Sequence, residues 1–236
     1  MKITIIIPVY NEEKTVDLII KKIVELNLGD FEKEIIVVND GSEDATQRKI
    51  DASKYISQIK FYSHNKNMGK GAAIRTGIQN ATGDFILIQD ADLEYDPKFI
   101  PLLLKHIKTA DSVVYGTRLN RLPHLRQEEN RVLFLTHYLG NRFLSLLTSL
   151  LYGQWLTDME TCYKIFPKKA VLKMTIHAKG FELEPEITAK LLKSGYKIVE
   201  VPITTIPRGY DEGKKLHTIR DGLKALMTLI KYRFVS

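Results

Sequence analysis

Two carboxylates stand two residues apart, directly after an apolar run, in this chain of 236 residues. Asp90 and Asp92 follow the apolar segment 85–88, and Glu94 extends the acidic group. Hard divalent cations take oxygen ligands, and Mg²⁺ is typically held by one or two carboxylates while substrate phosphates complete its shell. The spacing therefore predicts a Mg²⁺ or Mn²⁺ site for a phosphorylated substrate. Helix capping ahead of Asp96-Pro97 is the alternative.

Polar residues also follow two earlier apolar runs. Tyr10, Asn11 and Glu12 come after the run 3–9, and Asp40 leads Asp40-Gly41-Ser42 after the run 34–38. Ligands of open α/β sheets collect beyond the carboxyl ends of the strands, so these residues are expected to meet the acidic pair at one edge of a sheet. An Asp-Gly-Ser segment is also common in turns and helix caps, which is the alternative for that segment.

A glycine-rich loop, residues 65–73, opens a predicted helix and contains Gly69-Lys70-Gly71. Such a loop suits a phosphate because backbone N–H groups and the helix dipole point at the anion. The order of residues differs from a P-loop, and the third glycine of a dinucleotide-binding motif is missing. An ordinary turn before a helix is the alternative.

The elements that must position these residues alternate between short β-branched runs and helical patterns. This alternation predicts an α/β fold with a mostly parallel sheet, and the near-continuous Ile and Val runs predict helices on both faces. Strands are predicted at residues 3–9, 34–38, 59–63, 84–89, 112–115, 163–166 and 197–203. Helices in the second half are predicted at residues 131–152, 183–193 and 217–234.

Composition restricts the partners. The formal charge of +7 favours anionic ligands, and no interleaved basic and aromatic module indicates nucleic-acid binding. The single cysteine, Cys162, excludes an intrachain disulfide and a cysteine-rich zinc site, so a cytoplasmic location is expected. No signal peptide or transmembrane segment is predicted, because the apolar runs are short or interrupted by polar residues. Trp155 is predicted to be a packing anchor.

Taken together, these motifs resemble those of the family 2 glycosyltransferases with the GT-A fold, in particular the polyprenol-phosphate (dolichol-phosphate) mannose and glucose synthases. The resemblance covers nearly the whole chain. In the first half it rests on Pro8-Val9-Tyr10-Asn11-Glu12-Glu13, Val38-Asn39-Asp40-Gly41-Ser42, Asn67-x-Gly69-Lys70-Gly71, Asp90-Ala91-Asp92 and Gly116-Thr117-Arg118. In the second half it rests on Thr157-Asp158, Tyr163-Lys164, Phe181-Glu182-x-Glu184 and Gly195-Tyr196-x-Ile198-x-Glu200-Val201-Pro202.

The resemblance implies one GT-A domain over residues 1–236, with a Rossmann-like nucleotide-sugar-binding half of about 1–116 and an acceptor-binding half of about 117–236. The implied donor-binding residues are Pro8, Tyr10, Asn11, Glu12, Asp40, Gly69, Lys70, Asp90, Ala91 and Asp92. The implied metal ligands are Asp90, Asp92 and Glu94. The implied acceptor-phosphate residues are Arg118, Arg131, Arg208 and Lys214, and the implied catalytic residues are Asp90, Asp92, Arg118 and Asp158.

The expected reaction is inverting transfer of a hexose from a donor of the UDP-glucose or GDP-mannose type to a polyprenyl (dolichyl) phosphate. A divalent metal would stabilise the leaving diphosphate, and arginines would position the acceptor phosphate. Two alternatives remain open. The acceptor could be the hydroxyl group of a saccharide or small molecule, with Asp158 as the base. The chain could also be a catalytically silent module that binds nucleotide sugars or anionic lipids.

Peripheral contact with the cytoplasmic face of a membrane is a further expectation. The predicted helices 131–152 and 217–234 are amphipathic, and basic residues flank the apolar positions of the second. Such helices can lie in a lipid interface. Ordinary core packing explains the same pattern equally well, because every surface helix buries one apolar stripe.

Overall fold

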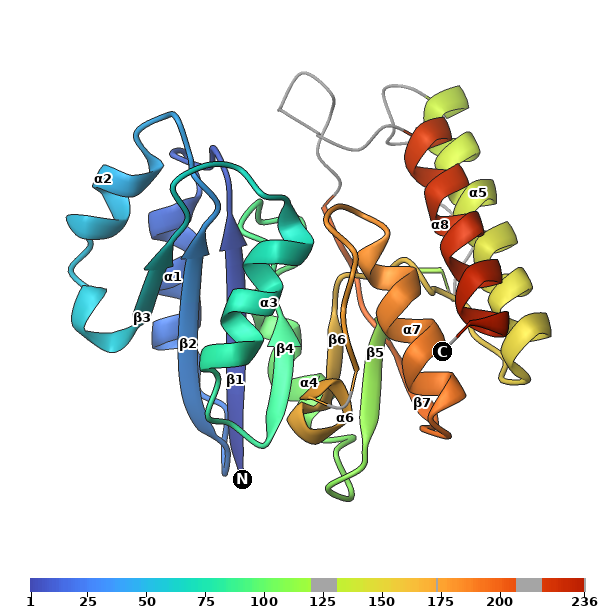
Figure 1. The fold of residues 1–236 in the computed structure, drawn as a ribbon. Helices are drawn as coiled ribbons and strands as arrows, with labels where there is room; N and C mark the ends of the chain where they lie inside the picture. The colour runs from blue at the N-terminus through green and yellow to red at the C-terminus, as the bar shows by residue number, and fades with distance from the viewer. Residues whose placement is uncertain (120–130, 173, 207–217, 236) are drawn as a thin grey trace.

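The computed structural model describes residues 1–119, 131–172, 174–206 and 218–235. A seven-stranded sheet in the order β3-β2-β1-β4-β6-β5-β7 forms the centre of this described part (Figure 1). Its strands are β1 (Lys2–Val9), β2 (Glu32–Asn39), β3 (Lys60–Ser63), β4 (Phe85–Ile88), β5 (Val113–Thr117), β6 (Lys164–Pro167) and β7 (Ile198–Pro202).

The sheet is mostly parallel. β1 pairs in parallel with β2 and β4, β2 with β3, and β5 with β7, whereas β6 runs antiparallel between β4 and β5. The carboxyl ends of β1, β2 and β4 therefore lie next to one another at one edge of the sheet. The sequence prediction that three polar strand ends converge is confirmed.

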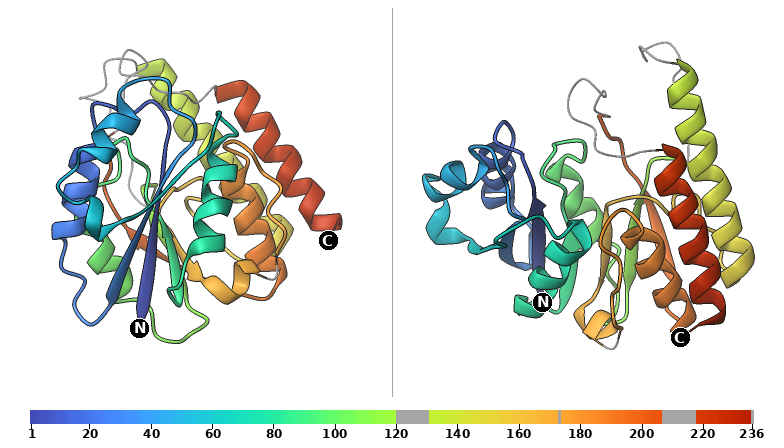
Figure 2. Two further views of the ribbon diagram at one scale, coloured as in Figure 1. Left: turned by 60° about the vertical axis from the view of Figure 1, so that its left-hand side comes forward. Right: turned by 45° about the horizontal axis from the view of Figure 1, so that its top comes forward.

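Helices cover both faces of the sheet. The main ones are α1 (Val16–Glu25), α3 (Lys70–Asn80), α5 (Arg131–Tyr152), α7 (Leu183–Lys193) and α8 (Thr218–Phe234). Shorter ones are α2 (Thr46–Asp51), η1 (Ile56–Gln58), η2 (Pro97–Phe99), α4 (Ile100–Leu104) and α6 (Lys168–Leu172). Right-handed crossovers place α1 and α3 on opposite faces, since the chain leaves β1 toward β2 and returns from β3 to β4 (Figure 1). α5 and α8 lie side by side next to α7, at the end of the molecule beyond β7 (Figures 1 and 2).

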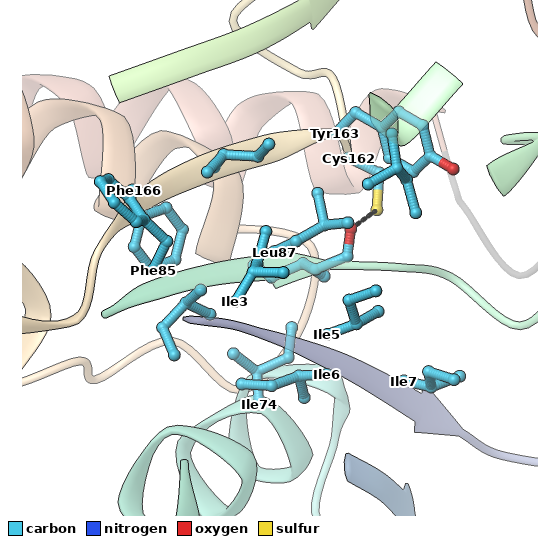
Figure 3. Packing of buried hydrophobic residues seen from close by; sticks show 14 of the residues in the cluster. Ile3, Ile5, Ile6, Ile7, Ile74, Phe85, Leu87, Cys162, Tyr163 and Phe166 are labelled. Carbon is cyan, nitrogen blue, oxygen red and sulfur yellow. Dashed lines mark hydrogen bonds between the residues drawn. The ribbon is translucent and has the colours of Figure 1, made fainter. Parts of the chain in front are cut away.

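The core is built on the isoleucines of β1. Ile3, Ile5, Ile6 and Ile7 are fully buried, because a central strand with helices on both faces exposes neither side. Figure 3 shows Ile6 against Ile74 of α3. Burial of each such side chain stabilises the fold by about 1.5–3 kcal/mol relative to exposure. This rigid centre holds the strand ends that carry the candidate site.

The predicted elements match the structure closely. The helices α5 and α7 begin and end where the sequence patterns predict, and the strand boundaries differ by one or two residues. Asp96 caps η2 by accepting from the Lys98 N–H ahead of the proline at its first position, which confirms it as the better cap of that segment. The prediction that Trp155 is a packing anchor is wrong. The residue is 69% exposed and lies in the irregular segment that follows α5.

None of the described helices combines the length and the apolar character needed to cross a lipid bilayer.

The side chain of Glu34 in β2 forms hydrogen bonds to β1, to β3 and to the loop before β4. Its buried carboxylate accepts hydrogen bonds from the Thr4 hydroxyl, from Lys60 Nζ at 2.7 Å and from the Thr82 N–H and hydroxyl at 2.7 Å each. Burial alone would raise the pKa of Glu34, but these donors lower it from 4.5 to about 2. The folded state therefore stabilises the charged form of the Glu34 carboxyl more than the unfolded state does.

Replacing Glu34 with Gln is expected to destabilise the fold by about 1–3 kcal/mol at neutral pH, because a buried charged acceptor is lost. The folded-state pKa lies below the unfolded value, so the stability from Glu34 is present above pH 4.5 and is lost as the pH falls toward 2. In urea unfolding measured from pH 7 to pH 3, the free energy of unfolding should therefore fall less with decreasing pH in Glu34→Gln than in wild type. Glu32→Gln, at an exposed position of the same strand, is the control. An unchanged acid slope in Glu34→Gln would contradict the assignment.

Candidate active site

The loops that follow β1 and β2 are joined by hydrogen bonds. The Asn11 N–H donates to Ser42 Oγ at 3.0 Å, and the Glu12 N–H donates to Thr46 Oγ1 at 2.9 Å. In return, the Glu43 N–H donates to Asn11 Oδ1 at 2.9 Å. Asn11 adopts a left-handed φ of 50°, which asparagine tolerates better than most residues. The predicted donor-binding segments after these two strands therefore form one connected rim.

Asp40 lies at the end of β2 and organises the glycine-rich loop. Its side chain is buried and accepts from His64 Nδ1 at 2.7 Å, from the Met68 N–H at 3.0 Å and from the Gly69 N–H at 2.7 Å. His64 Nε2 contacts Thr76 Oγ1 at 2.9 Å, which fixes the imidazole ring. Asp40 thus holds the loop that a nucleotide would meet. Its role in binding the nucleotide-sugar donor stays a prediction.

The backbone N–H groups of both glycines of that loop are engaged within the protein. The Gly69 N–H donates to Asp40, and the Gly71 N–H donates to the Lys179 carbonyl at 2.9 Å. The binding of the donor by Gly69 stays a prediction. A Cβ atom on Gly71 would stand 2.1 Å from the Ala178 carbonyl oxygen. Both glycines are needed because the loop packs directly against the backbone that leads to α7.

Lys70 joins the two halves of the chain. Its Nζ lies 2.9 Å from Asp90 Oδ1, after β4, and 2.9 Å from Glu184 Oε1, on α7. Burial alone would lower the pKa of Lys70, but the two carboxylates raise it well above its usual value. The pKa of Asp90 is lowered, because the Lys70 ammonium outweighs the effect of burial. A permanent cation therefore sits at the carboxyl end of β4.

Asp92 and Glu94 continue the rim beyond Asp90. Asp92 Oδ1 accepts from the Glu94 N–H at 3.0 Å, and Leu93 between them has a φ of 65°. A left-handed conformation is unusual for a bulky residue and indicates a backbone constrained by its surroundings. Among the described residues, no three His, Cys, Asp or Glu side chains are arranged to hold a metal ion by themselves. The predicted ligands Asp90, Asp92 and Glu94 therefore do not form a complete metal site by themselves.

The oxygen-only set still fits a hard cation that arrives with its substrate. Mg²⁺ keeps few protein ligands and takes the rest of its shell from substrate phosphates and water. Asp90 and Asp92 supply carboxylates two residues apart at an edge where side chains remain partly exposed. Their role as metal ligands stays a prediction.

Arg118 is held on the other side of the site by Asp158. Its Nε and Nη2 donate to the two carboxylate oxygens at 2.7 and 2.8 Å, and its backbone N–H adds a third bond at 2.9 Å. Asp158 is fully buried, and its own N–H donates to Glu200 Oε1 at 2.9 Å. The Asp158 oxygens are thus engaged by Arg118, which makes Asp158 a positioning residue in this structure. Its predicted role as a base would require that pair to open.

Further ionisable groups are buried between these two ion pairs. Burial and the nearby Glu184 raise the pKa of the Glu160 carboxyl to about 7. Burial lowers the pKa of Lys164 to about 8, although the neighbouring carboxylates oppose the change. Cys162 is buried, and its thiol pKa is raised well above the usual value mainly by burial, which fits a packing role for this residue. Its Sγ approaches the Ile88 carbonyl in Figure 3.

Three predicted acceptor residues cannot be placed. Arg208 and Lys214 lie outside the described residues, and the side chain of Arg131 at the start of α5 is likewise not described. Of the predicted acceptor group, the structure therefore places only Arg118 among its described side chains.

Several residues of this region had no role in the sequence prediction. Glu184 and Glu200 belong to motifs that carry the family resemblance, whereas Glu160 lies outside them. An acidic residue in the first turn of a helix, as at Glu184, is explained equally well by the helix dipole. The available signal was that Glu184 and Glu186 fall in the first turn of a helix whose apolar residues Leu183, Ile187 and Leu191 recur at helical spacing. Two acidic residues on a buried face require partners.

Replacing Gly71 with Ala should destabilise the protein by about 1–3 kcal/mol, because the added methyl meets backbone that cannot rotate away. Activity should fall as well, since the loop carries Lys70. Gly140→Ala is the matched control: Gly140 lies in α5 with nothing within 4 Å of an added Cβ, and its replacement should stabilise by about 0.5–1 kcal/mol. Urea unfolding of both variants tests the difference. A Gly71→Ala protein as stable as wild type would show that the close approach is not required.

The chain matches Glycosyl transferase family 2 over residues 4–174. It is 29% identical over 242 residues to a dolichol-phosphate mannosyltransferase of Pyrococcus furiosus, covering 98% of this chain but only 64% of that relative. It is 26% identical over 223 residues to glycosyltransferase AglJ of Haloferax volcanii, covering 93% of this chain and 68% of that relative.

Solved structures agree in fold. Glucosyl-3-phosphoglycerate synthase from Mycobacterium tuberculosis, in complex with Mn²⁺, uridine diphosphate and glucosyl-3-phosphoglycerate, superimposes with a TM-score of 0.74 at 20% identity. The match covers 100% of this chain and 81% of that one. The predicted family, fold class and type of enzyme are confirmed. The chain belongs to glycosyl transferase family 2, with the GT-A fold of a glycosyltransferase.

Proposed function

We propose that this chain transfers a hexose, with inversion, from a nucleotide sugar to the phosphate of a polyprenyl phosphate lipid. The observation that carries the proposal is the guanidinium of Arg118, which the buried Asp158 fixes. Tyr95 connects it to the Lys70–Asp90 pair: the Tyr95 ring lies 5.6 Å from the guanidinium, its hydroxyl accepts from the Cys162 N–H, and Cys162 Sγ lies 4.0 Å from Lys70 Nζ. A guanidinium held in one plane matches the geometry of a phosphate, and it keeps its charge at every physiological pH. Similarity to the dolichol-phosphate mannosyltransferase supports this class of acceptor.

The donor would bind across the carboxyl ends of β1, β2 and β4. Asp90, Asp92 and Glu94 would hold Mg²⁺ or Mn²⁺ together with the donor diphosphate, and structural neighbours solved with Mn²⁺ or Mg²⁺ and uridine diphosphate support this arrangement. When bound, the metal supplies Lewis-acid stabilisation of the charge that develops on the leaving diphosphate. Lys70 adds a fixed positive charge at the same place.

The transfer itself needs little proton chemistry. An oxygen of the acceptor phosphate attacks the anomeric carbon, the bond from that carbon to the diphosphate oxygen breaks, and the nucleoside diphosphate leaves with the electron pair. The acceptor oxygen is already anionic, so no strong base is required. Arg118 orients the acceptor, and Asp158 orients Arg118. A fixed donor and a fixed acceptor make the displacement effectively unimolecular, which is the main catalytic contribution of the chain.

A soluble phosphorylated acceptor is the second candidate. One structural neighbour was crystallised with phosphoglyceric acid, and an arginine fork would suit such an anion equally well. Transfer to its hydroxyl group would need a base, and Asp158 would have to leave Arg118 to serve as one.

The proposal is tested first by donor binding. UDP-glucose and GDP-mannose, each with and without Mn²⁺, are added in a thermal-shift panel, and the true donor should raise the midpoint by mass action. Transfer of radiolabelled hexose to a short-chain polyprenyl phosphate is then measured. Arg118→Lys should lower kcat/KM by about a hundredfold while donor binding stays unchanged, because Lys cannot reproduce the fork.

Arg48→Lys, at an exposed position of α2, is the matched control and should retain full activity. Absence of any midpoint shift and of any transfer would refute the proposed function. Transfer to 3-phosphoglycerate, but not to the lipid phosphate, would establish the second candidate. If Asp158→Asn abolishes transfer to a hydroxyl acceptor but spares both donor binding and transfer to a phosphate acceptor, the result favours Asp158 as the base, because a positioning role through Arg118 would affect both acceptors. Metal-dependent donor hydrolysis would also exclude a silent binding module.

We also propose that the paired helices α5 and α8 rest on the cytoplasmic face of a membrane. Each helix has an exposed apolar stripe at helical spacing, and basic side chains accompany the second stripe. The stripe of α5 consists of Leu139, Phe143, Leu146 and Leu150, and that of α8 of Leu223, Met227, Ile230 and Phe234. The basic residues are Arg220, Lys224, Lys231 and Arg233. This combination is typical of interfacial helices and would bring the site to its lipid substrate.

Flotation with liposomes that contain anionic phospholipid tests the membrane proposal. The double variant Phe143→Asp/Leu150→Asp should lose most binding, because two charged groups would enter the lipid interface. Both side chains are exposed, so the fold should tolerate the change. Ile56→Asp, at an exposed apolar position in η1, serves as control and should bind like wild type. Equal flotation of all three proteins would contradict this surface.

A further inference from the structure

Three buried side-chain oxygens near the ion pairs have no hydrogen-bond partner among the described residues. They are Oε1 of Glu160, Oε2 of Glu184 and Oγ1 of Thr161. Glu184 is only 5% exposed and Thr161 is completely buried. Native structures satisfy the great majority of buried polar atoms, because each unpaired one costs about 1–3 kcal/mol. Three such atoms in two neighbouring segments require an explanation.

Glu184 and Glu160 are connected to the donor and acceptor groups described above. Glu184 uses its other oxygen to hold Lys70, which in turn holds Asp90. The charges of Glu184 and Arg118 both act on the Glu160 carboxyl. The side chains of Lys70, Asp90 and Arg118 remain 18%, 21% and 23% exposed, so the region opens to solvent at its edge.

The missing partners are neutral hydrogen-bonding groups and not ions. The carboxylate charges already have nearby cations in Lys70, Lys164 and Arg118. A further cation would meet these positive groups, and an anion would meet the carboxylates. Hydroxyl groups carry no charge, donate to carboxylate oxygens, and both accept from and donate to a threonine hydroxyl.

We propose that Glu160, Glu184 and Thr161 form a subsite that binds hydroxyl groups of the transferred sugar. The inference rests on the proposed function and assigns the sugar-recognising residues of that same site. Between the diphosphate group at Asp90 and the acceptor group at Arg118, the sugar is the part of the donor that must occupy the intervening space. Carboxylates that accept hydrogen bonds from sugar hydroxyls discriminate strongly against sugars that lack those hydroxyls, because a missing hydroxyl leaves a buried polar group unpaired.

Binding measurements separate the sugar from the nucleotide. Calorimetry with Mn²⁺ compares UDP-glucose with UDP, and GDP-mannose with GDP, for wild type and Glu160→Gln. The variant should weaken binding of the nucleotide sugar by about tenfold or more, since a hydrogen bond to a carboxyl group is lost, while binding of the nucleoside diphosphate stays within about twofold. Equal losses for both ligands, or no loss for either, would overturn the proposal.

Thr161→Val provides a variant that should fold at least as well as wild type. If the hydroxyl merely lies buried without a partner, its replacement by a methyl group raises the melting temperature and leaves ligand binding unchanged, which would count against a sugar subsite. The proposal predicts a raised melting temperature together with weaker binding of the nucleotide sugar. Thr148→Val is the matched control, because Thr148 is equally buried but bonds the Leu144 carbonyl within α5. This variant should not change the difference in affinity between the nucleotide sugar and the nucleoside diphosphate.

The outcomes also distinguish this inference from the proposed function. Wild-type protein that binds neither nucleotide nor nucleotide sugar would refute both. Wild-type protein that binds and transfers the sugar, with variants that bind it equally well, would refute the subsite alone and assign the unpaired oxygens to internal water.

Discussion

The arrangement of the whole site depends on the ammonium group of Lys70 between Asp90 and Glu184. This contact joins the start of α3, the end of β4 and the start of α7, which come from distant parts of the chain. Three charges removed from bulk water are tolerated only when they compensate one another. Removing any member would leave the other charges uncompensated and would loosen the junction between the halves. Two carboxylates around one ammonium also leave this edge negative overall, which favours a divalent cation.

A second ion pair repeats this logic on the acceptor side. Asp158 holds Arg118 by two side-chain bonds and one backbone bond, and Glu200 holds the backbone of Asp158. Such a chain of contacts leaves the guanidinium few orientations before a ligand arrives. Preorganised charge stabilises a transition state without reorganisation during the reaction, which would explain why the site of the proposed glycosyl transfer buries so many paired ions.

The loops at the carboxyl edge combine rigidity with close approach. Gly71 brings the loop before α3 against the backbone before α7, and its N–H is used for that contact. Asp40 anchors the same loop from the other side through two backbone N–H groups. The glycine-rich segment therefore places a lysine, whereas a P-loop presents its N–H groups to phosphate. Gly71 and Asp40 therefore determine the position of the loop before α3.

The sequence by itself determined the class of fold, most element boundaries and the family. Hydrophobic periodicity is local, so α5 and α7 were predicted over their full lengths, and the polar ends of β1, β2 and β4 were predicted to converge because parallel strands end at one edge. Only the tertiary structure decided the partners of the charged residues. The contacts of Lys70 with Glu184, 114 positions away, and of Arg118 with Asp158, 40 positions away, carry no local signal.

Exposure was likewise decided by the tertiary structure. Trp155 was predicted to be a packing anchor, yet it is exposed in the segment that follows α5. The unpaired oxygens of Glu160 and Glu184 could not be predicted either, since an acidic residue is buried or exposed according to what packs against its element. Residue type and periodicity define which face of an element is apolar, but the pairing of buried charges depends on distances between segments that only the folded chain brings together.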